Sequence, residues 1–245
     1  MQEKVSQRDG LKALNMIRQR ILRLELGPGS VLDEAELAQA MKLSRTPVRE
    51  AIIQLISEDL VIRDGRSARI APLNLDDIPR LFGALLVSSR MINRLAAENR
   101  TITDLKRIEA AHLAFEETMY VNDYLKRQDA NLAFHMAIAD AARNPYFYDF
   151  YRRTLMASSR FSGATFVAAS QSEDTTQFVT ETSNPDLHAH ITTTSEHHGL
   201  ILKAIQERDI EMADRLAAEH QELWYNRLQR LIFPSASSAA NLSLR

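Results

Sequence analysis

The first part of the chain places apolar residues at helical intervals. Residues 11–26 repeat them every three or four positions, which predicts an amphipathic helix that ends at Gly27-Pro28-Gly29. Residues 33–41 predict a second, shorter helix, and Asp33 is a good cap residue for it. The apolar positions are Leu14, Ile17, Ile21 and Leu24 in the first helix and Leu37, Ala38 and Met41 in the second.

A third helix and a pair of strands follow. Lys42-Leu43 is long enough only for a turn, after which Ser44 is expected to cap a helix with Thr46-Pro47 in its first turn, where proline is tolerated. Residues 60–73 change to short strand-like runs around Asp64-Gly65, a hairpin signal. The order over residues 11–72 is helix, helix, turn, helix, β-hairpin. This order predicts a winged helix-turn-helix, whose third helix enters a DNA major groove and whose hairpin is the wing.

The rest of the chain predicts helices without strands. After a short junction at 73–76, helical patterns occupy 77–117 (two helices, the second capped by Thr103), 121–142, 146–161, 194–207 and 209–232. The Ser/Thr-rich residues 163–192 show no clean period and predict a loop, interpreted as a lid. The fold class is therefore mainly α, with a winged helix-turn-helix domain at 1–73, an all-helical bundle domain at 77–233 and a disordered tail at 234–245.

Composition narrows the classes of protein. Hydrophobic residues make up 45% of the 245 residues, which is enough for a sizeable core. The absence of cysteine excludes disulfides and thiolate metal sites and fits the cytoplasm of a bacterium. There is no apolar run of membrane-spanning length and no signal-peptide pattern, so neither a membrane partner nor export is expected. The net charge is −2, but residues 1–75 carry +2 and residues 76–245 carry −4, so the first part suits an anionic partner.

The sequence SRTPVREAIIQL at 44–55 places Arg45 and Arg49 on one side of the third helix. Arginine can bind guanine or phosphate through two hydrogen bonds, and hydroxyls at a helix N-terminus, here on Ser44 and Thr46, can donate to phosphate. The alternative is that these residues only solvate a helix face. Because two helices and a wing accompany them, DNA binding is favoured. The wing adds Arg63, Arg66 and Arg69, with Gly65 at its tip.

This segment resembles the N-terminal domain of GntR-family bacterial transcription regulators. The resemblance covers about residues 8–72 and rests on Gly27-Pro28-Gly29-Ser30-Val31-Leu32, Leu37-Ala38, Leu43 to Ala51, Leu55 and Leu60-Val61. It implies a homodimer that reads a short palindromic operator in double-stranded DNA. It also implies that Arg45, Thr46 and Arg49 contact the DNA, with Glu34 and Gly65 in support.

Histidines gather in the second part of the chain, where six of the seven follow residue 130. Asn131 and His135 are four residues apart on one expected helix, whereas His198 and His220 lie on two others. Helical bundles build metal sites from side chains on facing helices. A buried or surface role is the alternative for each histidine taken alone, and it is the expectation for His112, His188, His190 and His197.

The second part resembles the FCD domain of the FadR subfamily of GntR regulators. The resemblance rests on Asn131 to His135, Asn144-Pro145, Glu196 to Ile205, Arg208-Asp209, Ala213 and His220. It implies a divalent transition metal, zinc or alternatively nickel, held by Asn131, His135, His198 and His220. The chain departs from the family at Asn131, where the family has Asp, and at Leu85 and Ser89, where it has Arg and Glu.

The resemblance therefore implies a ligand-responsive transcription regulator, expected to be a repressor, and not an enzyme. Its effector is expected to be a small organic acid bound at the metal, near Arg90 and Arg94. Three alternatives stay open on the residues alone: a regulator for which the metal ion itself is the signal, a structural metal with an effector site elsewhere, and a histidine-metal hydrolase. The last lacks a carboxylate at a spacing typical of a catalytic base.

Overall fold

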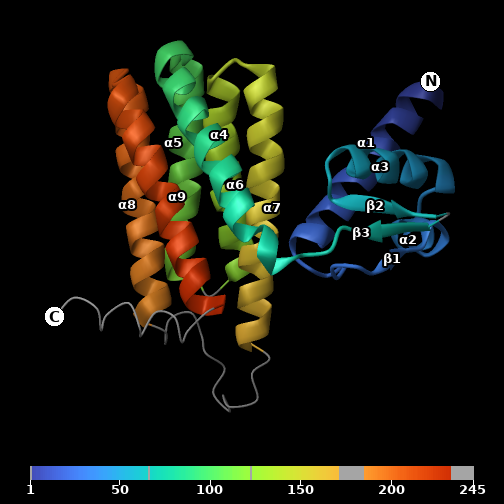
Figure 1. Ribbon diagram of the computed structural model, residues 1–245. Helices are drawn as coiled ribbons and strands as arrows, with labels where there is room; N and C mark the ends of the chain where they lie inside the picture. Colours follow the sequence, from blue (N-terminus) through green and yellow to red (C-terminus); the bar gives the residue numbers. More distant parts are fainter. Residues whose placement is uncertain (1, 66, 122, 171–184, 233–245) are drawn as a thin grey trace. The chain divides into compact units, whose positions relative to one another are not determined.

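The computed structural model describes residues 2–65, 67–121, 123–170 and 185–232, with side chains from residue 8 and, in α7, as far as residue 165 (Figure 1). Its internal contacts divide the chain into two units. The N-terminal unit consists of residues 1–76 with 159–164, and the helical unit of residues 77–158 with 165–245. The predicted fold class, a helix-turn-helix region with a small sheet followed by a helical domain, is confirmed.

The N-terminal unit contains three helices: α1 (Gln2–Leu22), α2 (Glu34–Met41) and α3 (Arg45–Ser57). The helix expected at 11–26 is wrong at both ends. It begins earlier because the polar residues before position 11 include good helix formers, although no apolar period marks them. It ends at Leu22 because Leu24 adopts a left-handed backbone with φ of 58°. Lys42 is also left-handed (φ 55°) and forms the predicted turn between α2 and α3.

A three-stranded antiparallel sheet completes this unit, in the order β1 (Val31–Leu32), β3 (Ser67–Ile70), β2 (Val61–Asp64). The hairpin prediction is confirmed: Asp64 pairs with Ser67, and Gly65 turns the chain with φ of +60°. Glycine adopts this conformation without the steric cost that a side chain would add. β1 was not predicted, because two residues are too few to show an alternating pattern.

The core of the N-terminal unit joins α1 to α3 and the sheet. Ile17, Ile21, Val48, Leu55 and Ile70 are fully buried. Ile17 and Ile21 lie on the apolar face predicted for the first helix, and burial of this core holds α3 with its opposite side exposed.

The helical unit is built from six helices in the described ranges (Figure 1). They are α4 (Ile78–Asn99), α5 (Ile102–Glu117), α6 (Tyr124–Ala141), α7 (Pro145–Ser170), α8 (Pro185–Glu207) and α9 (Ile210–Ile232). Short 3-10 turns occur at Leu75–Asp77 (η1) and Thr118–Tyr120 (η2). None of the helices that the structure describes has an apolar stretch long enough to cross a bilayer.

Two local predictions for this unit are wrong. Thr101, not Thr103, caps α5: its hydroxyl accepts from the Asp104 N–H, and the Asp104 carboxylate accepts from the Thr101 N–H. Residues 163–170 and 185–192 are helical, although a loop was expected over 163–192. In α8 the threonine hydroxyls are satisfied inside the helix, since Thr194 donates to the His190 carbonyl at 2.8 Å. The middle of the proposed lid, 171–184, and the expected tail lie outside the described residues.

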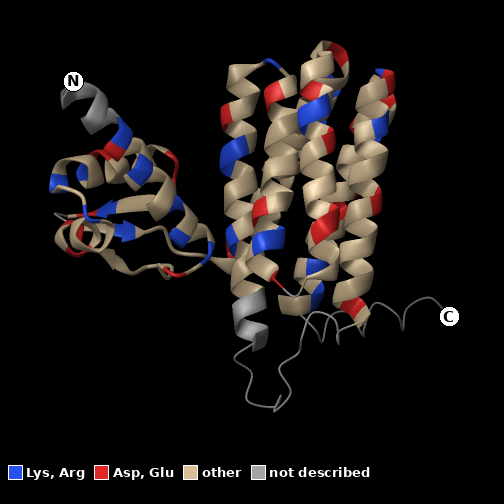
Figure 2. Ribbon diagram, turned by 180° about the vertical axis from the view of Figure 1, so that it is seen from behind, with Lys and Arg blue, Asp and Glu red and all other residues tan. Residues whose placement is uncertain are grey.

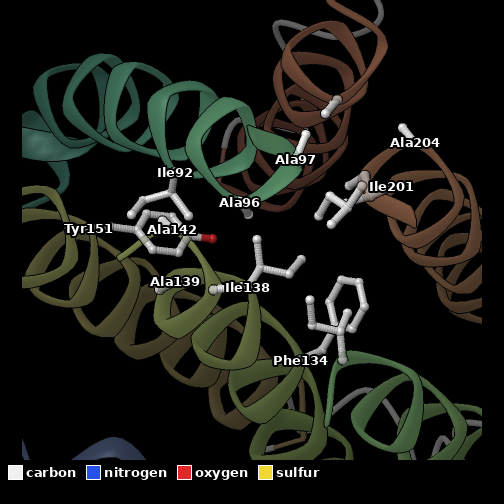
Figure 3. Close-up of a cluster of buried hydrophobic side chains, with 14 of the residues drawn as sticks. Ile92, Ala96, Ala97, Phe134, Ile138, Ala139, Ala142, Tyr151, Ile201 and Ala204 are labelled. Atoms are coloured by element: carbon white, nitrogen blue, oxygen red, sulfur yellow. The ribbon is translucent and has the colours of Figure 1, made fainter. Parts of the chain in front are cut away.

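Small and large side chains interlock in the core of the helical unit (Figure 3). Ala96 and Ala97 of α4 allow neighbouring helices to approach, while Phe134, Ile138 and Ile201 fill the space between them. Phe134 is fully buried and directly precedes His135. The apolar face of α6 therefore carries a histidine into the interior.

Candidate functional site

The N-terminal end of α3 presents a polar, basic surface. Ser44, Arg45, Thr46 and Arg49 are exposed, whereas Pro47 is buried with the core side of the helix. Ser44 occupies the N-cap position, as predicted, but its hydroxyl makes no capping hydrogen bond. The helix entrance therefore combines a hydroxyl group that the helix does not use with two exposed guanidinium groups, which suits a polyanion.

Glu34 holds one of these arginines in place. The Glu34 carboxylate accepts from Arg49 Nε at 3.1 Å and lies 3.0 Å from Arg49 Nη2. The Arg49 side chain is 64% exposed, so this ion pair is worth no more than about 1 kcal/mol. Glu34 can therefore orient the guanidinium group without preventing it from binding a stronger partner.

The wing contributes fewer available charges than expected. Arg63 is exposed, but Arg69 donates to Asp64 at 2.5 Å and to the Gly29 carbonyl at 3.3 Å. Arg69 thus fastens the hairpin to the preceding loop. Arg66 lies outside the described residues. Figure 2 shows basic positions on α3 and on the sheet of this unit, with acidic positions between them.

In the helical unit, α6, α8 and α9 bring three histidines together. His135, His198 and His220 each offer a ring nitrogen, and these atoms lie within 4.8 Å of one another. The Nε2 atoms of His135 and His220 are 3.2 Å apart, although 85 residues separate them in sequence. All three side chains are buried, with 3%, 0% and 7% exposure. Asn131, the fourth expected ligand, lies one turn before His135 on α6 and is partly buried.

Burial keeps these imidazoles neutral. It lowers the pKa of His135 to about 4. Burial is also the main cause that lowers the pKa of His198 and of His220 well below 6.5, and the neighbouring histidines lower both further. A neutral imidazole has a lone pair free to bind a metal, whereas an imidazolium does not. The cluster is therefore in its metal-binding form at neutral pH.

Three ring nitrogens of the cluster have no hydrogen-bond partner in the described part of the chain: Nδ1 and Nε2 of His198 and Nδ1 of His220. A buried polar atom without a partner costs about 1–3 kcal/mol. Helical bundles commonly place imidazole ligands in their interior, and Zn²⁺ accepts them. The residues present therefore fit a divalent metal ion that is held by imidazole nitrogens.

Polar side chains from other helices lie beside the cluster. Ser89 of α4 accepts from Gln221 of α9 at 3.2 Å and also hydrogen-bonds the Tyr151 hydroxyl of α7. The Tyr151 ring centroid is 6.4 Å from that of His135. Asn93 Oδ1 is buried and has no hydrogen-bond partner among the residues that the structure describes. Sequence reasoning missed Tyr151, Gln221 and Asn93; the available signal was a set of polar residues on otherwise apolar helix faces.

Arg90 and Arg94, the expected effector arginines, are engaged in ion pairs between α4 and α9. Arg90 donates to both oxygens of Asp214, at 3.1 and 2.6 Å, and this carboxylate raises the Arg90 pKa. Arg94 donates to Glu211 at 3.1 Å. Both arginines are therefore paired with carboxylates of α9 in this structure.

His112 and His197 are closer to the cluster than the sequence indicated. The ring centroids of His112 and His198 are 6.3 Å apart, and those of His197 and His220 are 6.1 Å apart. Neither residue belongs to the group of three. His112 and His197 thus adjoin the group of three without belonging to it.

A winged helix-turn-helix unit followed by a helical unit with a cluster of three buried histidines defines the class of two-domain transcription regulators. Residues 11–70 match the family "Bacterial regulatory proteins, gntR family", and residues 90–223, more than half of the chain, match the FCD domain. The chain belongs to the GntR family, in the group with a C-terminal FCD domain. Its relatives are transcription regulators and not enzymes.

The relatives include the HTH-type transcriptional regulator LutR of Bacillus subtilis, which is 34% identical over 137 residues. That match covers 49% of this chain and 62% of LutR, slightly less than two thirds of the relative. The HTH-type transcriptional repressor NanR of Klebsiella aerogenes is 27% identical over 224 residues, covering 83% of this chain and 79% of NanR. Among solved structures, E. coli McbR/YncC has the same fold, with a TM-score of 0.74 at 20% identity over 91% of this chain and 98% of that one.

Proposed function

We propose that the protein is a repressor that binds a short palindromic operator as a homodimer in the bacterial cytoplasm. The exposed N-terminal end of α3 supports this, since Arg45 and Arg49 project from one side of it and Thr46 lies between them. In this proposal the two arginines contact base edges or phosphates, Ser44 and Thr46 donate to phosphate, and Glu34 orients Arg49. Gly65 lets the wing approach the backbone, together with Arg66. Repression is inferred from the name of NanR.

The helical unit is the sensory part of this proposal. The observation that carries it is the group of three buried, neutral histidines, in which ring nitrogens of His198 and His220 have no partner in the described part of the chain. We propose that Asn131, His135, His198 and His220 hold a divalent transition metal, zinc in the first instance, with nickel as the alternative. Asn131 would contribute a neutral carbonyl oxygen where related proteins have a carboxylate, so the centre carries more positive charge. A bound divalent ion supplies a Lewis-acid site for a carboxylate oxygen.

The effector in this proposal is a small organic acid. Hydroxyl and amide groups for it are available on Ser89, Asn93, Tyr151 and Gln221. Asn93 Oδ1 accepts no hydrogen bond in the described part of the chain, so it is free to accept one. Arg90 and Arg94 would reach it only after their ion pairs with α9 open. Such opening would change the contact between α4 and α9. An effector alters DNA affinity only if it binds one arrangement of the dimer better than another.

The DNA part is tested by the affinity of the full chain for the DNA beside its own gene. Arg49→Ala should abolish sequence-specific binding at fixed salt, with the fold and oligomeric state intact. The matched control is Arg80→Ala, because Arg80 is 79% exposed in α4 and also pairs with one carboxylate. Equal specific affinity of the Arg49→Ala variant and the wild type would refute the assignment of α3.

The sensory part is tested by mass analysis of gently purified protein. His135→Ala and His220→Ala should each lose the metal, whereas His188→Ala, an exposed position on α8, should keep it. Full occupancy of both variants would refute the centre. The second measurement is DNA release from the metal-loaded protein. Release by organic acids supports the proposed effector class, while release by chelation alone, with no effect of acids, would show that the ion is the signal.

A further inference from the structure

A groove crosses the surface of the helical unit between α5 and α8, with η2 at one end. Its volume is about 620 Å³. Glu116 and Glu117 of α5 and Glu196 of α8 line it, and the described lining residues include no Lys or Arg. Three carboxylates in a concave surface create a negative potential that raises the local concentration of cations.

His112 forms part of the groove wall. Its side chain is 13% exposed, and its Nε2 atom lies 3.7 Å from the Glu116 carboxylate. Its other nitrogen, Nδ1, is buried and has no hydrogen-bond partner within the described ranges. A side chain at Gly199 would begin 3.5 Å from His112 Nε2, so the glycine leaves this edge of the ring uncovered by α8.

The same histidine adjoins the buried centre. The ring of His112 meets that of His198 edge to face, with centroids 6.3 Å apart and planes at 74°. Two other rings around His198 are apolar: Phe134 stacks on it at 4.0 Å, and Phe115 meets it at 4.7 Å. Of these three neighbours, only His112 has nitrogen atoms and also lines the groove.

His198 is closed to solvent, with 0% exposure, and neither of its ring nitrogens has a hydrogen-bond partner among the described residues. A hydrated divalent ion loses its water stepwise, so it needs polar groups along its way to such a site. Apolar rings offer none. Glu116 and Glu196 line the groove, the His112 Nε2 atom lies 3.7 Å from the Glu116 carboxylate, and the His112 ring adjoins that of His198.

We propose that the groove between α5 and α8 is the route by which a divalent metal ion reaches the histidine centre. The carboxylates of Glu116 and Glu196 attract the hydrated ion, and His112 binds it in passage and transfers it to His198. The inference rests on the metal centre proposed above. It differs from that proposal because groups on the route govern the rates of loading and release, whereas the ligands govern occupancy.

The experiment mixes chelator-treated full-length protein with Co²⁺ in a stopped-flow instrument and follows the visible absorption of bound cobalt. The double variant Glu116→Gln/Glu196→Gln should load about tenfold more slowly at low salt, and the difference should shrink at high salt. Release to a chelator should slow by a similar factor, so that the final occupancy is unchanged. The matched control is Glu109→Gln, which removes the same charge from an exposed position of α5 outside the groove.

A second variant tests the histidine. His112→Phe keeps an aromatic ring beside Phe134 but removes both nitrogens, so loading should slow while final occupancy stays the same. Equal loading rates in the wild type, the double glutamate variant and His112→Phe would overturn the route and leave the centre standing. Reduced occupancy in His112→Phe would overturn it too, because His112 would then be a ligand. If the wild type and His135→Ala bind cobalt equally weakly, the centre and the route both fail.

Discussion

An ion pair between Arg18 and Glu58 connects α1 to the end of the proposed recognition helix. Arg18 Nε donates to one Glu58 oxygen at 2.9 Å and Nη2 donates to the other at 2.7 Å. The Glu58 side chain is only 2% exposed and that of Arg18 is 17% exposed. Replacing Arg18 with methionine keeps much of the aliphatic stem but leaves the Glu58 carboxylate buried without its guanidinium partner.

The expected cost follows from this burial. Breaking a buried ion pair by removing one partner costs about 3–5 kcal/mol, because the remaining buried charge loses its counter-ion. The matched control is Arg20→Met in the same helix, whose partner Glu25 lies 3.4 Å away with 47% of its side chain exposed. An exposed pair of this kind contributes about 0–1 kcal/mol. The two substitutions should therefore differ by at least about 2 kcal/mol.

Hydrogen exchange measured by mass spectrometry on the full chain can resolve this difference within the N-terminal unit. Arg18→Met should accelerate exchange in α1 and α3, while peptides of α4 and α9 should exchange as in the wild type. Adding Glu58→Met should recover most of the lost protection, since the buried carboxylate that lost its guanidinium group is then removed as well. The reasoning fails if Arg18→Met and Arg20→Met show the same protection in α3, or if the double variant is no better than Arg18→Met.

Three further outcomes concern the helical unit, and urea unfolding followed by Trp224 fluorescence checks each of them. For metal-free protein, lowering the pH from 7 to 5 should reduce the free energy of unfolding by about 2 kcal/mol through His135 alone. The pKa of His135 is about 4 in the folded protein and about 6.5 in the unfolded chain. The stability that is present above pH 6.5 is therefore lost as the pH falls toward 4. His135→Phe should remove this part of the dependence, and an unchanged pH profile in that variant contradicts the argument. Thr101→Ala should lower the free energy of unfolding by about 1 kcal/mol, because it removes the N-cap of α5, whereas Thr103→Ala should change it little. A larger loss for Thr103→Ala than for Thr101→Ala would reject the capping assignment. Phe134→Ala should cost about 3–5 kcal/mol, since the ring is fully buried, and a loss below about 1 kcal/mol would mean that the core closes around the gap.

Local pattern predicted most elements of the helix-turn-helix region, although it missed β1 and both ends of α1. The period of apolar residues, the turn at Lys42 and the Asp64-Gly65 hairpin signal are properties of short segments, and each led to an element that the structure contains. The SRTPVREA motif led to the family, which the matches to residues 11–70 and 90–223 establish. In the helical unit, two predictions failed because a short-range hydrogen bond determined the local structure and its sequence signal was not recognised. The cap at Thr101 and the threonine hydroxyls of α8, which bond back within their own helix, are the two examples.

The sequence alone determined that His135, His198 and His220 lie on helices, and the family resemblance grouped them. Only the tertiary structure decided that α6, α8 and α9 turn these faces inward, so that nitrogens from residues 85 positions apart approach to 3.2 Å. The same packing buried the rings and lowered the pKa of each, which no spacing can indicate. It also paired Arg90 with Asp214 and placed His112 between an acidic groove and His198. Helical periodicity gives the direction of a side chain around its own axis, but the groups that it meets depend on how separate helices pack.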